Sequence, residues 1–330
     1  MQRVAIVGAG HMGKVHGAAY AEMPTAELVA IMDIRREAAQ ELASSLGAKA
    51  FTDFDEMLRS ANPDVIDVCV PTPSHKEYVI KAAEAGKHVV TEKPMARTLE
   101  DCRQMIEATE RAGVTFMVAH VLRFFPEFAA AKVQIDAGAV GNPAVVRTSR
   151  GGSFPSADRD WYANFDLSGG VVLDLIIHDF DWLRWTFGEP ERVYAKGLVE
   201  RKIKRLDYAL VTIRFKSGVI AHVEGTWANP AGFAVEFELA GDGGMLDFHS
   251  DAATPLAIAR ASADEKGPGV TVPGSPTAES PYFLELQHFI DCVENGAKPS
   301  ITPEDGLRAV EISLAALESI RTGKPIRISD

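Results

Sequence analysis

Cysteine is scarce in this sequence of 330 residues, which contains only Cys69, Cys102 and Cys292. Their odd number and wide separation argue against a disulfide framework, and no two of them form a CxxC pair. The nine histidines include no HExxH motif, and no cluster of cysteine and histidine has the spacing of metal ligands. The GxSxG motif of many serine hydrolases is also missing. We therefore expect reduced, mostly buried thiols, no bound metal and no serine nucleophile.

Positive charge is outnumbered as well, because 34 lysines and arginines stand against 46 aspartates and glutamates, a formal net charge of −12. A nucleic-acid partner is therefore not expected. No apolar run approaches the roughly 20 residues of a membrane-spanning helix. The first expected strand begins at Val4, which leaves no room for a signal peptide. We expect a soluble protein of the cytoplasm, long enough for two domains that each have a core.

What the sequence does contain is a GxGxxG motif directly after an apolar strand at residues 4–7. A helix is expected at residues 15–23. Gly8 allows the tight turn, Gly10 lets the backbone approach a pyrophosphate, and Gly13 lets the helix lie close to the strand. Phosphates are attracted by the free N–H groups and the dipole at a helix N-terminus. The motif predicts a dinucleotide-binding site.

The acid at the end of the second apolar run favours NAD as the cofactor. Asp33 lies twenty residues after Gly13, where a carboxylate accepts hydrogen bonds from the ribose hydroxyls. It would repel the 2′-phosphate of NADP, but Arg35 and Arg36 follow closely, so NADP stays possible. The expected cofactor contacts in this stretch are Gly8, Gly10, His11, Met12, Gly13, Asp33, Ile34 and Arg35.

Strands and helices alternate up to residue 122, which predicts a parallel, doubly wound Rossmann sheet with strand order 3-2-1-4-5-6 over residues 1–122. Ligands bind beyond the carboxyl ends of such strands. Apolar strands are expected at residues 65–70, 88–91 and 114–119, and helix caps at Asp53, Ser74 and Thr98. Candidate functional segments are therefore residues 8–13, 33, 71–75, 92–94 and 120–123.

The second half, residues 123–330, has a different rhythm. Strands near 192–199, 208–215, 219–227 and 234–240 predict an α+β domain with a large, open, mainly antiparallel sheet. Residues 261–281 are rich in Gly, Pro and Ser and are interpreted as a surface loop. The few helices predicted here cannot cover both faces of the sheet. We therefore expect a homodimer or homotetramer through it, in a domain for substrate binding and oligomerisation.

Three places carry residues suited to catalysis or substrate binding. Lys93, in Glu92-Lys93-Pro94 after the fifth strand, is either part of a charged loop or an ammonium that stabilises a substrate oxygen. Asp174, His178 and Asp181 have the spacing of one face of an otherwise apolar helix. In one interpretation, Asp174 and His178 are a buried pair whose hydrogen bonds are satisfied. In the other, His178 is a general base that Asp174 holds in orientation.

Arg123 is the third place. It either binds substrate oxygens or ties the two domains together, and the pattern does not choose between these roles. Trp161 lies in the loop of residues 151–170 before the Asp174 helix and is expected to contact the substrate.

In order along the chain, GAGHMG, Asp33, the Pro71–His75 segment, Glu92-Lys93-Pro94 and Gly169-Gly170 followed by Asp174, His178 and Asp181 resemble the Gfo/Idh/MocA oxidoreductase family. The resemblance spans essentially the whole chain. It implies a nicotinamide-dependent dehydrogenase of sugars, polyols or related carbonyl compounds. It also implies that Lys93 is the catalytic lysine, that His178 is the catalytic base and that Asp174 is the acidic partner of His178. The Lys93–Pro94 bond is then expected to be cis, and the cofactor to be flanked by Pro71, Thr72, His75, Glu92 and Lys93.

Three hypotheses follow. The first is an NAD-dependent dehydrogenase of an inositol-like polyol or an aldose, in which Lys93 and His178 converge beside the nicotinamide. The second is a glycoside-cleaving enzyme that uses bound NAD transiently, as some members of the family do. The third is a non-catalytic, nucleotide-binding regulator, which the combination of Lys93, Asp174 and His178 disfavours because a sensor needs no proton acceptor.

Overall fold

The computed structural model describes residues 1–156, 158–199, 207–229, 232–250 and 279–328. By its contacts the chain forms two compact units, Met1–Phe124 with Thr277–Arg308, and Phe125–Pro276 with Ala309–Asp330. The first limit lies close to the boundary predicted after residue 122. The second unit, however, is not the continuous 123–330 of the sequence-based division. Most of the loop predicted at residues 261–281 lies outside the described residues.

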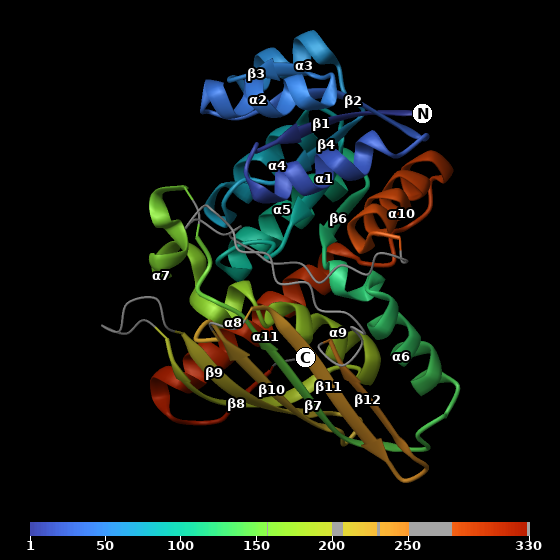
Figure 1. Cartoon of the computed structure of the whole chain (residues 1–330), viewed down its shortest axis with the longest axis vertical. Coiled ribbons are helices and arrows are strands. Elements are labelled where there is room, and N and C mark those ends of the chain that lie inside the picture. The colour runs from blue at the N-terminus through green and yellow to red at the C-terminus, as the bar shows by residue number, and fades with distance from the viewer. Residues whose placement is uncertain (157, 200–206, 230–231, 251–278, 329–330) are drawn as a thin grey trace. The chain divides into compact units, whose positions relative to one another are not determined.

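The first unit is built on a sheet of six parallel strands, as predicted (Figure 1). Its order is β3-β2-β1-β4-β5-β6, which confirms the Rossmann order expected from the alternation of strand and helix. The strands are β1 Gln2–Val7, β2 Ala26–Met32, β3 Lys49–Phe51, β4 Val65–Val68, β5 His88–Glu92 and β6 Phe116–Ala119. The carboxyl ends of β1, β4 and β5 therefore lie next to one another, and these are the strands that precede the predicted cofactor and lysine segments.

Helices follow each strand of this sheet. They are α1 His11–Ala21, α2 Arg36–Leu46, α3 Phe54–Ala61, α4 His75–Glu84 and α5 Leu99–Ala112, with short 3-10 turns η1 Thr72–Ser74 and η2 Val121–Phe124. Helix α1 begins at His11, four residues before the predicted start, because Gly10 itself is the N-cap. The predicted caps are confirmed at Asp53 and Thr98, whose side chains accept from the N–H groups of Glu56 and Asp101 at 2.7 and 3.1 Å.

The cap predicted at Ser74 is wrong. Its side chain makes no capping hydrogen bond, and its backbone angles, φ −97° and ψ −7°, are helical rather than extended. The reason is that η1 runs directly into α4, so the chain has already turned before the position at which an N-cap would act.

Helix α10, Pro281–Asn295, supplies core residues to the first unit although it lies far along the chain. Its Leu286, Phe289 and Ile290 are fully buried in the same cluster as Val4 and Ile6 of β1. Local sequence patterns carry no information about this packing partner. The sequence-based division therefore assigned the helix to the other domain.

The second unit contains a sheet of seven strands in the order β12-β11-β7-β10-β9-β8-β13. All neighbours are antiparallel except β7 and β10, which confirms the mainly antiparallel, open sheet. The strands are β7 Pro143–Gly151, β8 Pro190–Leu198, β9 Tyr208–Phe215, β10 Ile220–Thr226, β11 Ala234–Gly241, β12 Met245–His249 and β13 Ile326–Arg327. Burial alternates along β9 and β10, as expected for a sheet with one covered face.

The helices of this unit include α6 Pro126–Asp136, α7 Phe165–Ser168, α8 Gly170–Asp174 and α9 Ile177–Phe187, with the 3-10 segment η3 Asp158–Ala163. Helix α11, Pro303–Thr322, contains the limit between the units at Arg308. Trp182 of α9 is buried, and its indole N–H donates to the carbonyl of Phe128 in α6 at 3.2 Å. In the described part of the chain, no helix has both the length and the apolarity that crossing a membrane requires.

Candidate functional site

The glycine-rich turn after β1 is sterically required. Gly8 has φ +110°, and a Cβ there would lie 2.6 Å from the carbonyl oxygen of Cys69, at the end of the neighbouring strand. A Cβ on Gly13 would lie 1.9 Å from the carbonyl oxygen of Gly8. These contacts leave no room for a side chain at either position, as the GxGxxG motif predicts.

The N-terminus of α1 fits a pyrophosphate. Its N-cap residue, Gly10, has no side chain to cap the first turn, and a Cβ there would meet nothing within 4 Å. The N–H groups of the first turn are therefore open to an anion. His11 is exposed at this end of the helix, while Met12 packs in part against the core cluster.

Asp33, at the end of β2, is held as an ionised carboxylate. It accepts from the N–H groups of Ala9 and Arg35 at 2.9 and 2.8 Å, and the Arg35 guanidinium donates to both of its oxygens at 3.1 Å. Burial alone would raise the pKa of Asp33, but the hydrogen bonds from Arg35 and Ala9 outweigh it, and the pKa is lowered. Asp33 thereby links the glycine-rich turn to the end of β2. Ile34 is 70% exposed beside it.

The loops that follow β4 and β5 are fastened together by His75. Its ring Nε2 lies 2.8 Å from the Val70 carbonyl oxygen, and its Nδ1 lies 3.0 Å from that of Pro94. The imidazole is buried, which lowers its pKa and favours the neutral form. Thr72 is buried in the same segment and Pro71 is exposed. His75 thus holds the backbone of the loops after β4 and β5, at the edge of the sheet where the cofactor is expected.

Lys93 follows directly after β5, and the Lys93–Pro94 bond is cis, as the family resemblance implied. The backbone N–H of Lys93 donates to the Glu92 carboxylate at 3.0 Å. The other Glu92 oxygen lies 3.2 Å from Nε2 of His16. Glu92 is buried; burial by itself raises the pKa of a carboxyl, but His16 and then Lys93 lower it below the usual range.

Two residues next to this position were missed by the sequence analysis. His16, on α1, lies 2.8 Å from Asp67 through its Nδ1, and both side chains are completely buried. Asp67 is in the middle of β4, inside the run that was interpreted as apolar. An aspartate within a continuous buried strand is costly unless it is paired, so its presence was the signal to follow.

Cys69 completes a group of three ligand-type side chains with His16 and Asp67, although no metal site was expected from the sequence. The thiol donates to Asp67 at 3.3 Å and lies 3.4 Å from the His16 ring. Two ligand atoms on one tetrahedral zinc, at bond lengths near 2.0 Å, lie about 3.3 Å apart. The 2.8 Å between His16 and Asp67 is instead a hydrogen-bond distance.

In the second unit, the single helix predicted through Asp174 and His178 is wrong. Helix α8 ends at Asp174 and α9 begins at Ile177. The carbonyl of Val171 accepts from the N–H groups of both Leu175 and Ile176 at 3.0 Å, which interrupts the regular hydrogen-bond ladder of an α-helix. Asp174, His178 and Asp181 therefore do not form a stripe at regular helical spacing. Asp174 and Asp181 are buried and His178 is half-buried.

Asp179 of α9, which the sequence analysis did not single out, forms a buried ion pair. It is fully buried, and the Arg150 guanidinium of β7 donates to it from Nε at 2.7 Å. The pair joins the helix that carries His178 to the seven-stranded sheet.

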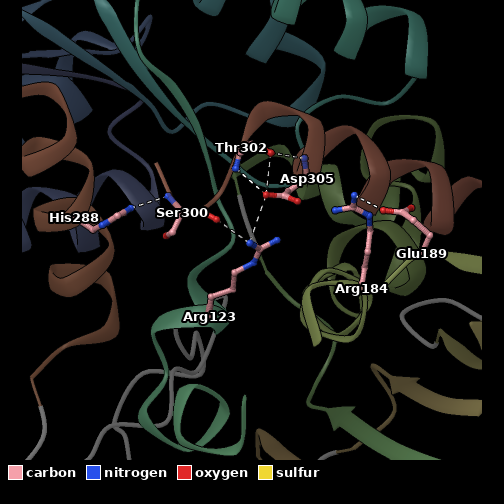
Figure 2. A network of polar contacts seen from close by, with 7 residues as sticks. All are labelled: Arg123, Arg184, Glu189, His288, Ser300, Thr302 and Asp305. Carbon is pink, nitrogen blue, oxygen red and sulfur yellow. Dashed lines mark hydrogen bonds and ion pairs between the residues drawn. The ribbon is translucent and has the colours of Figure 1, made fainter. Parts of the chain in front are cut away.

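Arg123 is buried and contacts the segment that leads into α11, while a substrate contact for it stays a prediction. Figure 2 shows its Nη1 donating to the carbonyl of Ser300 at 3.0 Å, with Asp305 at 3.5 Å. Asp305 also caps the start of α11 by accepting from the N–H of Thr302 at 2.8 Å. All of these residues belong to the first unit, so these contacts lie within it.

Trp161, in η3, is half-buried and stacks on Tyr162 with ring centroids 4.1 Å apart. Tyr162 in turn lies edge-on to Trp227, at the end of the seven-stranded sheet. The aromatic side chains of the loop thus support one another. A substrate contact for Trp161 stays a prediction, as do the catalytic roles of Lys93 in the first unit and of Asp174 and His178 in the second.

Two family models match the chain. The one described as oxidoreductase family, NAD-binding Rossmann fold, covers residues 2–120, and the one described as the GFO/IDH/MocA C-terminal domain covers residues 128–247. Myo-inositol 2-dehydrogenase from Thermotoga maritima is 32% identical over 99% of both chains. Scyllo-inositol 2-dehydrogenase (NAD(+)) from Bacillus subtilis is also 32% identical, over 99% of this chain and 96% of that protein.

A solved structure agrees with these sequence matches over the full length. Scyllo-inositol dehydrogenase from Lactobacillus casei, with bound cofactor NAD(H) and scyllo-inositol, matches with a TM-score of 0.82 at 26% identity. The match covers 99% of each chain. Both units of this chain therefore have counterparts in a single protein of known structure.

Proposed function

Because this chain belongs to the Gfo/Idh/MocA oxidoreductase family, we propose that its substrate is an inositol or a closely similar cyclic polyol. The chain is an NAD-dependent dehydrogenase acting on a CH–OH group. Full-length similarity to two inositol dehydrogenases supports the substrate class. The observation that carries the proposed chemistry is the place of Lys93, at the carboxyl end of β5, two strands from the glycine-rich turn after β1.

Bound NAD⁺ supplies the hydride acceptor. As the substrate carbon loses a hydride, its hydroxyl must lose a proton for the carbonyl to form. We assign that proton to the imidazole of His178, with Asp174 stabilising the imidazolium. The ammonium of Lys93 donates a hydrogen bond to the same oxygen and stabilises its developing negative charge. The glycine-rich turn would hold the pyrophosphate and Asp33 the adenosine ribose, and the carboxylate of Asp33 favours NAD over NADP.

Single substitutions test Lys93 and His178, the two residues assigned to the reacting oxygen. Lys93→Met and His178→Gln should each lower turnover of an inositol by about 10²-fold or more, because each removes a group that acts on the reacting oxygen. The affinity for NAD⁺, measured by calorimetry, should stay within about twofold. Lys87→Met and His249→Gln are matched controls, with a half-buried and an exposed side chain respectively, and should keep normal turnover. Near-normal turnover in Lys93→Met and His178→Gln would remove both assignments.

The same assay separates dehydrogenation from glycoside cleavage. A dehydrogenase accumulates NADH in proportion to the polyol oxidised, whereas an enzyme with transient redox releases a sugar product without net NADH. The assay should include a panel of inositols, aldoses and simple glycosides, with NADH absorbance and product release followed together. Glycoside product without NADH would replace the proposed reaction, and no turnover across the panel would favour a regulator.

We also propose that the chain is a homodimer or homotetramer through the seven-stranded sheet. Tyr194 and Leu210 are 37% and 43% exposed on neighbouring strands β8 and β9, and their register places them on the same face. Exposed apolar side chains on an open sheet favour pairing with a second copy. Light scattering at micromolar concentration should give a multiple of the 35.7 kDa chain mass, and a monomer mass would rule the assembly out.

A further inference from the structure

His16 lies between two carboxylates at the centre of the first unit. Its Nδ1 is 2.8 Å from Asp67 of β4, and its Nε2 is 3.2 Å from Glu92 of β5. The His16 and Asp67 side chains are completely buried, and that of Glu92 is 8% exposed. Helix α1 carries His16 three residues after Gly13, so the ring projects from the helix whose N-terminus forms the dinucleotide site.

Both carboxyl groups in this row lie against the same imidazole ring. Burial lowers the pKa of His16 on its own, but the Asp67 carboxylate overrides that effect and raises the pKa well above the usual range. Burial likewise raises the pKa of Glu92, and the hydrogen bond and charge of His16 reverse it. The three side chains are therefore an imidazolium with a carboxylate on each side at neutral pH. An isolated buried charge would not persist, whereas one with hydrogen-bonded partners does.

The row continues to the backbone of Lys93. The Glu92 oxygen that does not face His16 accepts from the Lys93 N–H at 3.0 Å. On the far side of Lys93, the carbonyl of Pro94 lies 3.0 Å from the ring of His75. The backbone of Lys93 is thus held on both sides by side chains that are themselves buried.

Burying three charged groups costs free energy that apolar side chains of similar volume would not. Strand β4 is otherwise apolar and fully buried, so the stability of the sheet does not explain why an aspartate occupies position 67. What the row accomplishes is local. His16 holds the Glu92 carboxylate, and that carboxylate in turn holds the backbone N–H of Lys93. A catalytic group must be positioned to within a few tenths of an ångström for the reaction to be fast.

We propose that His16 is a positioning residue for Lys93, acting as an imidazolium that holds the Glu92 carboxylate against the Lys93 backbone N–H. The inference rests on the proposed role of Lys93 at the substrate oxygen. His16 itself touches neither substrate nor cofactor in this account. It acts through Glu92, so the two residues form one unit.

The test compares His16→Gln, Glu92→Gln and the double variant with wild type in NAD⁺ reduction by an inositol. Each single variant breaks the imidazolium–carboxylate pair, so kcat should fall about tenfold or more, while KM and the Kd for NAD⁺ stay within about twofold. The double variant should be no slower than the slower single variant, because both changes remove the same contact. A substrate deuterated at the reacting carbon should show a larger isotope effect on kcat than in wild type.

His88→Gln is the matched control, at the opposite end of the same strand β5. Its Nδ1 accepts from the Thr115 N–H at 3.0 Å, so the change loosens the strand without touching Glu92. It should lower the thermal midpoint but leave kcat and the isotope effect unchanged. Should His16→Gln fail to fold, Glu92→Gln carries the same comparison alone.

Three results separate the inference from the proposed function. Lys93→Met with normal turnover would overturn the role of Lys93 and with it this inference. Slow Lys93→Met with normal kcat in His16→Gln and Glu92→Gln would overturn the inference only. Losses that multiply in the double variant would also overturn it, because His16 and Glu92 would then act independently.

Discussion

The two units bury charge in different ways. In the first, His16 is shared by two carboxylates, and the row ends at the backbone of Lys93. In the second, Arg150 and Asp179 form a direct pair between β7 and α9. A shared cation keeps one partner when the other is removed, whereas a guanidinium that loses its paired carboxylate is left buried and charged. The two arrangements should therefore differ in what a single substitution costs.

The largest effect is expected in the second unit. Asp179→Asn should lower the free energy of unfolding by about 3–5 kcal/mol, because it leaves Arg150 as a buried charge without its paired carboxylate. Urea unfolding followed by circular dichroism measures the change. Asp136→Asn is the control, because it breaks an ion pair with Lys132 that is largely exposed on the aspartate side and should cost under about 1 kcal/mol. Equal costs for the two variants would show that the buried pair carries no special weight.

A smaller effect with a defined pH dependence is expected in the first unit. Glu92→Gln should cost about 1–3 kcal/mol at pH 7, because His16 keeps Asp67 as a partner. The folded pKa of Glu92 is lowered, so its contribution is fully present above the ordinary value of 4.5 and is lost as the pH falls through the folded pKa. The difference between wild type and variant in urea unfolding should therefore narrow below pH 4.5. A difference that is constant down to pH 3 would contradict an ionised Glu92.

The smallest effect concerns two helix starts of the first unit that look alike in the sequence. Asp53→Ala should destabilise the protein by about 1 kcal/mol, because it removes the hydrogen bond to the Glu56 N–H. Ser74→Ala should change stability by less than about 0.3 kcal/mol, because Ser74 makes no capping bond. Thermal unfolding of both variants measures the contrast, and an equal loss would mean that Ser74 does cap α4.

Much of the first unit was predictable because its signals are local. The glycines of the turn are dictated by contacts with Cys69 and with one another, within one strand–turn–helix segment and its neighbour. Strand order followed from the alternation of strand and helix, since parallel strands need crossover helices. The caps at Asp53 and Thr98 depend on residues three positions apart.

The candidate site was predictable only in part. Residue type and order identified Lys93, Asp174 and His178 as candidates, but helical spacing placed the last two on one continuous helix. In the structure the helix is interrupted at Leu175 and Ile176. Both residues are apolar, so the spacing of the polar residues gave no sign of the interruption. For Arg123 the sequence left two roles open; the structure adds its contacts with Ser300 and Asp305, and a substrate contact stays a prediction. His16 was overlooked because its partners come from strands more than fifty residues away.

The sequence by itself determined the Rossmann order, the dinucleotide turn, the family and its NAD-dependent chemistry. These depend on backbone sterics, hydrophobic period and residues close together in the chain. Only the tertiary structure showed that α10 belongs to the core of the first unit and that Arg123 contacts Ser300. It also showed that the buried imidazole of His16 contacts Glu92, the residue before Lys93. Such contacts join segments distant in the chain, and their free energy comes from burial and charge pairing that a linear pattern does not record.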